Sequence, residues 1–199
     1  MRPRARRSPS LSDAPGAATR SRGAASGFDR PVRVYLDTCI LSRLKDVELG
    51  AVPTEPRLHA DSLVLPSLVK RCRQRGVALC TSEESLAEID RLAPHRPDIR
   101  DRLRLAVAAV EVLPVPSDRA VSHALVAAVE SFLLAKTRVR NPRKRAALRR
   151  DALHLAAAVD GSCDVFLTTD YASIWAYRRG LQRLLDLRVM RPVELAALV

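Results

Sequence analysis

Four acidic residues occupy positions from which their carboxylates could act together. Asp37 follows the apolar stretch "VRVYL", and Asp170 follows "DVFLTT". Glu88 lies in "TSEESLAEI", shortly after the apolar "VALC", and Asp151 opens "DALHLAAAV". Carboxylates within a few ångströms of one another repel and raise each other's pKa values unless a cation neutralises them. Mg2+ and Mn2+ suit such a cluster because these ions prefer oxygen ligands.

Each of these acids also has an ordinary structural explanation. Asp37 and Asp170 can cap the helices that follow them, which is the commonest task of an aspartate after a strand. Glu88 can be a solvated helix residue, and Asp151 can pair with the arginines near it in the sequence. The chemical interpretation therefore depends on the fold bringing all four acids to one place.

Short apolar stretches alternate with amphipathic ones from residue 32 onward. The predicted strands are Val32 to Leu36, Val77 to Cys80, Val112 to Val115, Val165 to Thr168 and Leu187 to Met190. Six helices are predicted, at Pro56 to Arg75, from Ser82 to about Leu92, and at Arg100 to Val110, Asp118 to Ala135, Ala146 to Val159 and Tyr171 to Leu185. Pro66 should kink or break the first of them. Ser82 and Ser117 are expected to cap the second and fourth helices, and Gly161 to close the fifth.

Strands that alternate with helices predict the fold class. Such an order requires crossover connections, so we expect an α/β fold with three α/β/α layers and a mostly parallel central sheet. In open parallel sheets, ligands bind beyond the carboxyl ends of the strands. Asp37 and Asp170 lie at two such ends, and Glu88 lies on a helix that leaves a third. Asp151 opens a helix of small and apolar residues, so all four carboxylates should project toward one edge.

The chain divides into two compositional parts. Its 199 residues are 47% hydrophobic, which predicts one domain with one sizeable core. Residues 1 to 31 contain seven Arg, two Asp and few large apolar side chains. Such a segment cannot bury enough surface to offset its ordering entropy, so we expect a disordered basic tail followed by a folded domain at residues 32 to 199.

Charge and cysteine spacing restrict the partners and the compartment. The formal net charge of +12 favours a polyanionic partner, either nucleic acid or an anionic membrane surface, and charge alone does not choose between them. No apolar run reaches the length of roughly 20 residues that a membrane-spanning helix needs, so no membrane partner is expected. The four cysteines are widely spaced without a CxxC pair, which predicts reduced thiols and a cytoplasmic protein.

The quoted motifs resemble those of PIN-domain nucleases, a family whose commonest bacterial setting is the VapC-type toxin. The resemblance covers roughly Arg33 to Glu194. "YLDTCIL" is similar to the family's first motif, and "TSEESLAEI" to the segment that carries its glutamate, which corresponds to Glu88. "DALHLAAAV" and "CDVFLTTD" are similar to the third and fourth motifs, and "RVMRPVEL" to the closing segment. The PIN-like fold implied is the three-layer arrangement expected above.

The resemblance implies a divalent-metal-dependent endoribonuclease that hydrolyses RNA phosphodiester bonds. The residues that it assigns to catalysis and to binding of Mg2+ or Mn2+ are Asp37, Glu88, Asp151 and Asp170. The residues expected to support them are Thr38, Thr168 and His154. A satisfied structural histidine is the alternative for His154. Ser173 stands where many relatives carry another acid, which leaves a complete second metal site open.

A run of basic residues precedes Asp151. Eight Lys or Arg and no acid occur between Lys136 and Arg150. Such a run is either a solvated face or, beside a metal-site acid, a rim that neutralises the charge of the RNA backbone. The predicted nucleic-acid-binding residues are Arg143, Lys144, Arg145, Arg149 and Arg150. Aromatic residues make up only 4% of the chain, and the candidates for base stacking are Tyr35, Tyr171, Trp175 and Tyr177, of which Tyr35 is expected in the core.

The family resemblance also implies partners. RNA would be the substrate, a cognate antitoxin would cover the site if the protein is the toxin of a toxin-antitoxin pair, and a second copy of the chain would form a homodimer. The alternative function is a catalytically weak or inactive PIN-like module that binds nucleic acid or protein. Such a module has no need to keep four acids, so the filled positions favour the enzyme.

Overall fold

The computed structural model describes residues 32–92, 97–108, 110–113 and 120–199. The predicted basic tail, residues 1 to 31, lies outside the described residues. Ser117 and Asp118, which were expected to open a helix, also lie outside them. Within the described part, no helix is both long and apolar enough to cross a membrane.

Five parallel strands form one sheet in the order β3-β2-β1-β4-β5. In the central strand β1, Tyr35 lies opposite Cys80 of β2 and Phe166 of β4. The strands are β1 Arg33–Leu36, β2 Ala78–Ser82, β3 Glu111–Leu113, β4 Val165–Leu167 and β5 Arg188–Met190. All five predicted strands are therefore confirmed, with bounds that differ by at most two residues from those expected. The predicted end of the third strand, Val115, lies outside the described residues.

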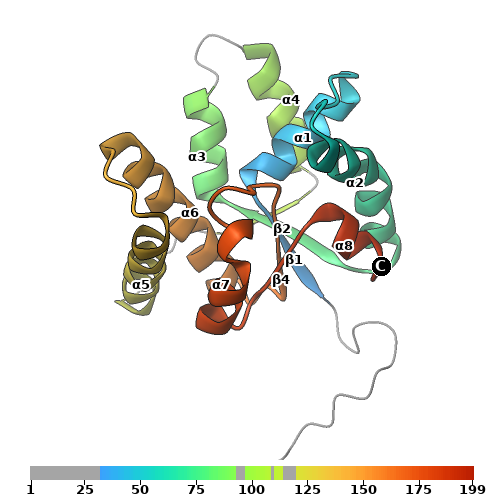
Figure 1. Ribbon diagram of the computed structural model, residues 1–199. Helices are drawn as coiled ribbons and strands as arrows, with labels where there is room; N and C mark the ends of the chain where they lie inside the picture. The colour runs from blue at the N-terminus through green and yellow to red at the C-terminus, as the bar shows by residue number, and fades with distance from the viewer. Residues whose placement is uncertain (1–31, 93–96, 109, 114–119) are drawn as a thin grey trace, which may run out of the picture.

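Helices cover both faces of the sheet (Figure 1). On one face, Val34 and Leu36 pack with apolar residues of α1 Thr38–Glu48, α2 Pro56–Gln74, α3 Glu83–Leu92, α4 Pro97–Ala108 and α8 Pro192–Ala196. On the other face, Tyr35 and Phe166 pack with α5 Ala120–Thr137, α6 Pro142–Asp160 and α7 Arg178–Leu185. The predicted three-layer α/β/α fold with a parallel central sheet is confirmed.

Two helices begin earlier than the sequence analysis placed them. The helix that carries Asp151 begins at Pro142 rather than at Ala146, because the Asn141 side chain accepts hydrogen bonds from the backbone N–H groups of the first turn. Its end before Gly161 is as predicted. In the same way, α4 begins at Pro97 and ends at Ala108, whereas the expected range was 100 to 110.

The sequence analysis expected either a kink or a break at Pro66, and helix α2 is not broken there. The helix continues to Gln74 with Pro66 inside it. Pro66 itself is exposed, whereas Leu65 and Leu68 on either side are completely buried. Packing of both halves against the sheet therefore offsets the hydrogen bond that the proline removes.

The prediction of a last long helix from Tyr171 to Leu185 is wrong over the first half of this range. Residues 171 to 174 form a turn, a short 3-10 helix η1 follows at Trp175–Tyr177, and only Arg178–Leu185 is α-helical. The turn forms because Asp170 Oδ1 accepts the backbone N–H groups of Ala172 at 2.8 Å and Ser173 at 3.0 Å. Helix α1 follows Asp37, as the capping explanation assumed, although no bounds were predicted for it, and α8 was not predicted.

Candidate active site

Asp37 lies at the carboxyl end of β1, in the N-cap position of α1, but its side chain makes no capping hydrogen bond. Instead, Asp37 Oδ2 accepts a hydrogen bond from the Thr168 hydroxyl at 2.6 Å and one from the Cys39 thiol at 3.1 Å. Asp37 is only 7% exposed, and this burial raises the pKa of its carboxyl group. The capping explanation therefore does not account for this carboxylate.

Thr168, at the carboxyl end of the neighbouring strand β4, joins Asp37 to Asp170. Its hydroxyl donates to Asp37 and accepts the backbone N–H of Asp170 at 2.9 Å. Asp170 does organise the following turn through Oδ1, so the capping explanation holds for that oxygen. Its other oxygen, Oδ2, accepts the Ser173 hydroxyl and faces the site.

Ser173 connects Asp170 to Asp151, which lies on α6. The Ser173 hydroxyl is 2.8 Å from Asp151 Oδ2 and also contacts Asp170 Oδ2. A hydroxyl has a single proton and can donate to only one of these carboxylates at a time. The arrangement therefore has room for one further positive charge, either a proton or a cation.

The pKa of Asp151 is raised, as expected for a carboxylate with too little positive charge around it. Burial is the largest cause that raises this pKa, and the nearby charge of Asp37 is the next, so that it reaches about 7. The Ser173 hydrogen bond and His154 oppose this rise only in part. At neutral pH the Asp151 carboxyl group is thus poised between the protonated and the ionised state.

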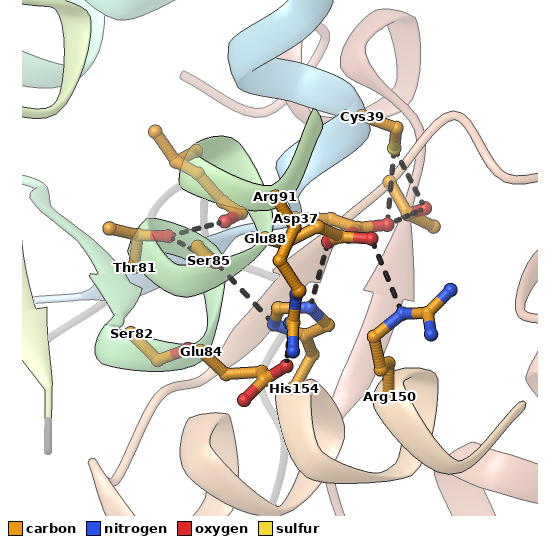
Figure 2. Close-up of polar contacts among 12 residues, drawn as sticks. Asp37, Cys39, Thr81, Ser82, Glu84, Ser85, Glu88, Arg91, Arg150 and His154 are labelled. Carbon is orange, nitrogen blue, oxygen red and sulfur yellow. Dashed lines mark hydrogen bonds and ion pairs between the residues drawn. The ribbon is translucent and has the colours of Figure 1, made fainter. Parts of the chain in front are cut away.

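Glu88, on α3, differs from the three aspartates because two cationic side chains contact its carboxylate. Its Oε2 is 3.3 Å from His154 Nε2, and its Oε1 is 3.6 Å from Arg150 Nε. Figure 2 shows the Glu88 carboxylate between these two side chains, beside Asp37. The hydrogen bond with His154 is the main cause that lowers the pKa of Glu88 to about 2. Glu88 is therefore an ionised group whose charge is already compensated within the protein.

His154 is both a buried structural residue and a support for the site. It is 2% exposed, and its Nδ1 lies 2.8 Å from the Tyr35 hydroxyl, which in turn is 2.6 Å from the Ser82 hydroxyl. Burial disfavours the charged imidazole, but the hydrogen bond with Glu88 and the charge of Asp37 outweigh it and raise the pKa of His154. A chain of polar groups thus runs from the core to Glu88. Figure 2 shows its last step, the contact of His154 with the Glu88 carboxylate.

Thr38 was expected to support the acids with a hydrogen bond. Its hydroxyl is buried, and among the described residues it forms no hydrogen bond of ordinary geometry. An interaction of Thr38 with Glu88 nevertheless contributes to the lowered pKa of that acid. Thr38 therefore supports Glu88 rather than the aspartates.

The side chains at the edge fit a hard divalent cation by their chemistry, although they do not form a finished cage. Within the described ranges, no three His, Cys, Asp or Glu side chains are gathered closely enough to hold a metal ion as they stand. Mg2+ usually takes one or two carboxylates and completes its shell with water and substrate phosphate. Asp37 and Asp151, with raised pKa values, match that requirement.

The predicted nucleic-acid-binding residues divide into two groups along α6. Arg149 lies 3.7 Å from Glu130, and Arg150 lies against Glu88, so both have an acidic partner. The remaining residues, Arg143, Lys144 and Arg145, are exposed in the first turns of the helix.

Sequence analysis missed a second buried carboxylate, Asp61 of α2. Asp61 is completely buried and accepts hydrogen bonds from Arg191 Nε at 3.1 Å, from the backbone N–H of Val193 at 3.3 Å and from the Tyr171 hydroxyl. No apolar pattern or strand end marks this position. Tyr171 and Trp175, two candidates for base stacking, lie in the same region, and the Arg191 guanidinium is 5.3 Å from the Tyr171 ring centroid.

Comparisons with known proteins bear on the fold. No protein-family model matches the chain, and no curated protein matches it. Among solved structures, the chain is similar to one chain of the crystal structure of VapBC2 from Rickettsia felis bound to a DNA fragment from their promoter. The TM-score is 0.50 at 12% identity, over 80% of this chain and 98% of that chain. The chain thus has a PIN-like three-layer α/β/α fold with a parallel five-stranded sheet.

Proposed function

We propose that this protein is a divalent-metal-dependent endoribonuclease that hydrolyses RNA phosphodiester bonds. The observation that carries the proposal is the convergence of Asp37, Asp151 and Asp170, from three different elements, at the carboxyl edge of the sheet. Among the described residues, no Lys, Arg or His forms an ion pair with any of the three. His154 offsets the raised pKa values of Asp37 and Asp151 only in part, so these buried acids can accept a further cation from outside.

The roles of the side chains follow from their surroundings. When bound, Mg2+ or Mn2+ supplies Lewis-acid stabilisation of the phosphate charge and acidifies an attacking water. Asp37 and Asp151 would hold the ion, while Thr168 and Ser173 fix the directions of the carboxylates. Glu88 has a pKa of about 2 and is therefore a weak proton acceptor, so we assign it the task of orienting a water.

Cleavage of a labelled RNA with Mg2+, Mn2+ or EDTA tests this function. We expect cleavage with either metal and none with EDTA. Asp37→Asn and Asp151→Asn should each lower the rate by about 10^3-fold or more, because loss of metal-dependent stabilisation is worth several kcal/mol. Asp90→Asn is the matched control, since Asp90 is an exposed acid that pairs with Arg104 outside the site. Metal-dependent cleavage that survives both substitutions at the site would refute the assignment.

A toxin role is a further part of the proposal. The similar solved structure is a VapBC2 complex, and an antitoxin that inserted a basic side chain would neutralise the uncompensated acids. Expression of the unaltered chain should then arrest bacterial growth, and Asp37→Asn should relieve the arrest. Growth arrest that persists with Asp37→Asn would separate any toxicity from this site.

A second candidate is a nucleic-acid-binding module of weak or absent activity. It is favoured by one observation, that Ser173 occupies the position between Asp151 and Asp170 where a further acid would complete a second metal site. The cleavage assay discriminates the two functions, because a binding module retains RNA without cutting it.

A further inference from the structure

An open cavity of about 590 Å3 lies where the end of α5 meets η1 and the start of α7. Four of the side chains that line it are cationic, and none is acidic. The residues that matter here are Phe132, Lys136, Tyr177, Arg178, Arg179 and Arg183. Sequence analysis did not single out this surface, because its cations come from two segments that are far apart in the chain.

The positive charge of this cavity is not compensated. Lys136, Arg179 and Arg183 are exposed, and among the described residues none of them forms an ion pair with an acid. Arg149 and Arg150 on the neighbouring helix α6 do have acidic partners. The cavity therefore concentrates positive charge that is available to an anionic ligand.

The walls of the cavity are held together by specific contacts. The Tyr177 hydroxyl donates to the backbone carbonyl of Lys136 at 3.3 Å, which joins η1 to the end of α5. Gly180 allows Phe132 to approach α7, because a Cβ at this position would lie 2.3 Å from Phe132 Cζ. The Arg178 guanidinium lies 3.7 Å from the centroid of the Trp175 ring, which fixes its direction. The cationic groups are thus partly preorganised.

The cavity continues directly from the acidic edge along the chain. Asp170 and Ser173 are followed by Trp175, Arg178 and then the remaining cavity residues. The backbone N–H of Trp175 donates to the Asp170 carbonyl at 2.9 Å. Trp175, against which Arg178 of the cavity lies, therefore connects the cavity to Asp170.

We propose that the cavity binds the phosphodiester backbone of single-stranded RNA on one side of the acidic edge. Arginine side chains match phosphate oxygens in geometry and charge, and an aromatic wall of Phe132 and Tyr177 can contact a base. The identity of the polyanion rests on the proposed function. The cavity would then hold the strand while the aspartates act on the next phosphate in reach.

Binding of a fluorescent single-stranded RNA, followed by anisotropy over a range of salt concentrations, tests the proposal. All variants carry Asp37→Asn, so the measurement does not depend on cleavage. We expect Arg179→Ala/Arg183→Ala to lower affinity roughly tenfold. The same pair should make the log Kd–log salt slope shallower by about 1.4, since each phosphate that a cation neutralises on a single strand contributes about 0.7 to that slope. Arg179→Lys/Arg183→Lys should restore part of the affinity.

Two matched pairs of substitutions make the result specific. Lys70→Ala/Arg75→Ala removes two exposed charges, one on α2 and one at its C-cap, on the opposite face of the sheet, and should have little effect. Arg143→Ala/Arg145→Ala tests the exposed start of α6 in the same way. Equal decreases in affinity for the α2 pair and the cavity pair, or a decrease confined to the α6 pair, would overturn the proposal.

The outcome separates this inference from the proposed function. RNA cleavage by the unaltered protein, with RNA affinity unchanged by the cavity pair, would leave the function standing and reject the cavity. RNA binding that depends on the cavity, without cleavage by the unaltered protein, would support the cavity as an RNA site and reject the proposed nuclease function.

Discussion

Asp61 and Asp37 are both buried aspartates, but their carboxylates have different partners. Asp61 on α2 accepts hydrogen bonds from a guanidinium, a phenol and a backbone N–H group. Asp37 at the end of β1 receives one hydroxyl and one thiol among the described residues. A buried charge is costly unless it is paired, so Asp61 is complete within the chain and Asp37 is not. Asp61 is therefore a structural group, whereas Asp37 is the group that we propose to bind a cation.

The same contrast occurs inside the candidate site, between Glu88 and Asp151. His154 and Arg150 contact Glu88, and its pKa falls to about 2. Asp151 has the Ser173 hydroxyl, and its pKa rises to about 7. Glu88, which His154 and Arg150 contact directly, is suited to orienting a water, whereas Asp151, whose raised pKa His154 offsets only in part, is the acid that we propose to hold a cation.

The largest effect on stability is expected from Asp61→Ala. This substitution leaves the half-buried Arg191 without its acidic partner, and breaking a buried pair in this way costs about 3–5 kcal/mol in the free energy of unfolding. Urea unfolding measures the change. Asp90→Ala, at an exposed ion pair with Arg104, is the control and should cost far less. Equal costs would remove the distinction between the two buried aspartates.

A smaller effect is expected from pH, through Asp151. Its pKa is raised by folding, so its ionisation disfavours the folded state, and stability is lost as the pH rises from about 4 to about 7. Without divalent metal, the unaltered protein should gain about 1.4 kcal/mol relative to Asp151→Asn for each pH unit lowered in this window. Urea unfolding in EDTA at about pH 6 and pH 5 measures the difference. A stability difference that does not change with pH would contradict the raised pKa.

The smallest effect is expected from Ser173→Ala. Loss of the hydroxyl removes a hydrogen bond that orients Asp151, which is worth about 1 kcal/mol, or roughly a fivefold decrease in RNA cleavage rate. Ser62→Ala is the control, because Ser62 is a buried serine of α2 whose hydroxyl donates to the Leu58 carbonyl away from the site. If the two serine variants cleave RNA equally well, Ser173 does not orient the acids.

Strand ends were the part of the site that the sequence could predict. Apolar stretches located β1 and β4, and the acids that follow them, Asp37 and Asp170, lie at one edge because parallel strands share their carboxyl ends. The turn after Asp170 could not be read from helical periodicity, because side-chain hydrogen bonds to backbone N–H groups replace the helix there.

Contacts between distant segments were beyond sequence reasoning. Asp61 and Arg191 are far apart in the chain, and nothing in the local pattern of either pairs them. The start of α6 is different, because Asn141 followed by Pro142 is a helix-start signal that was present and would have placed the helix correctly.

Calorimetric titration with Mn2+ at neutral pH tests the central claim most directly, since it measures whether the acidic edge binds a divalent cation. The unaltered protein should bind Mn2+, Asp151→Asn should lose this binding, and Asp61→Asn should retain it. Mn2+ binding that is equal in the unaltered protein and in Asp151→Asn would contradict the claim that this edge is the metal site.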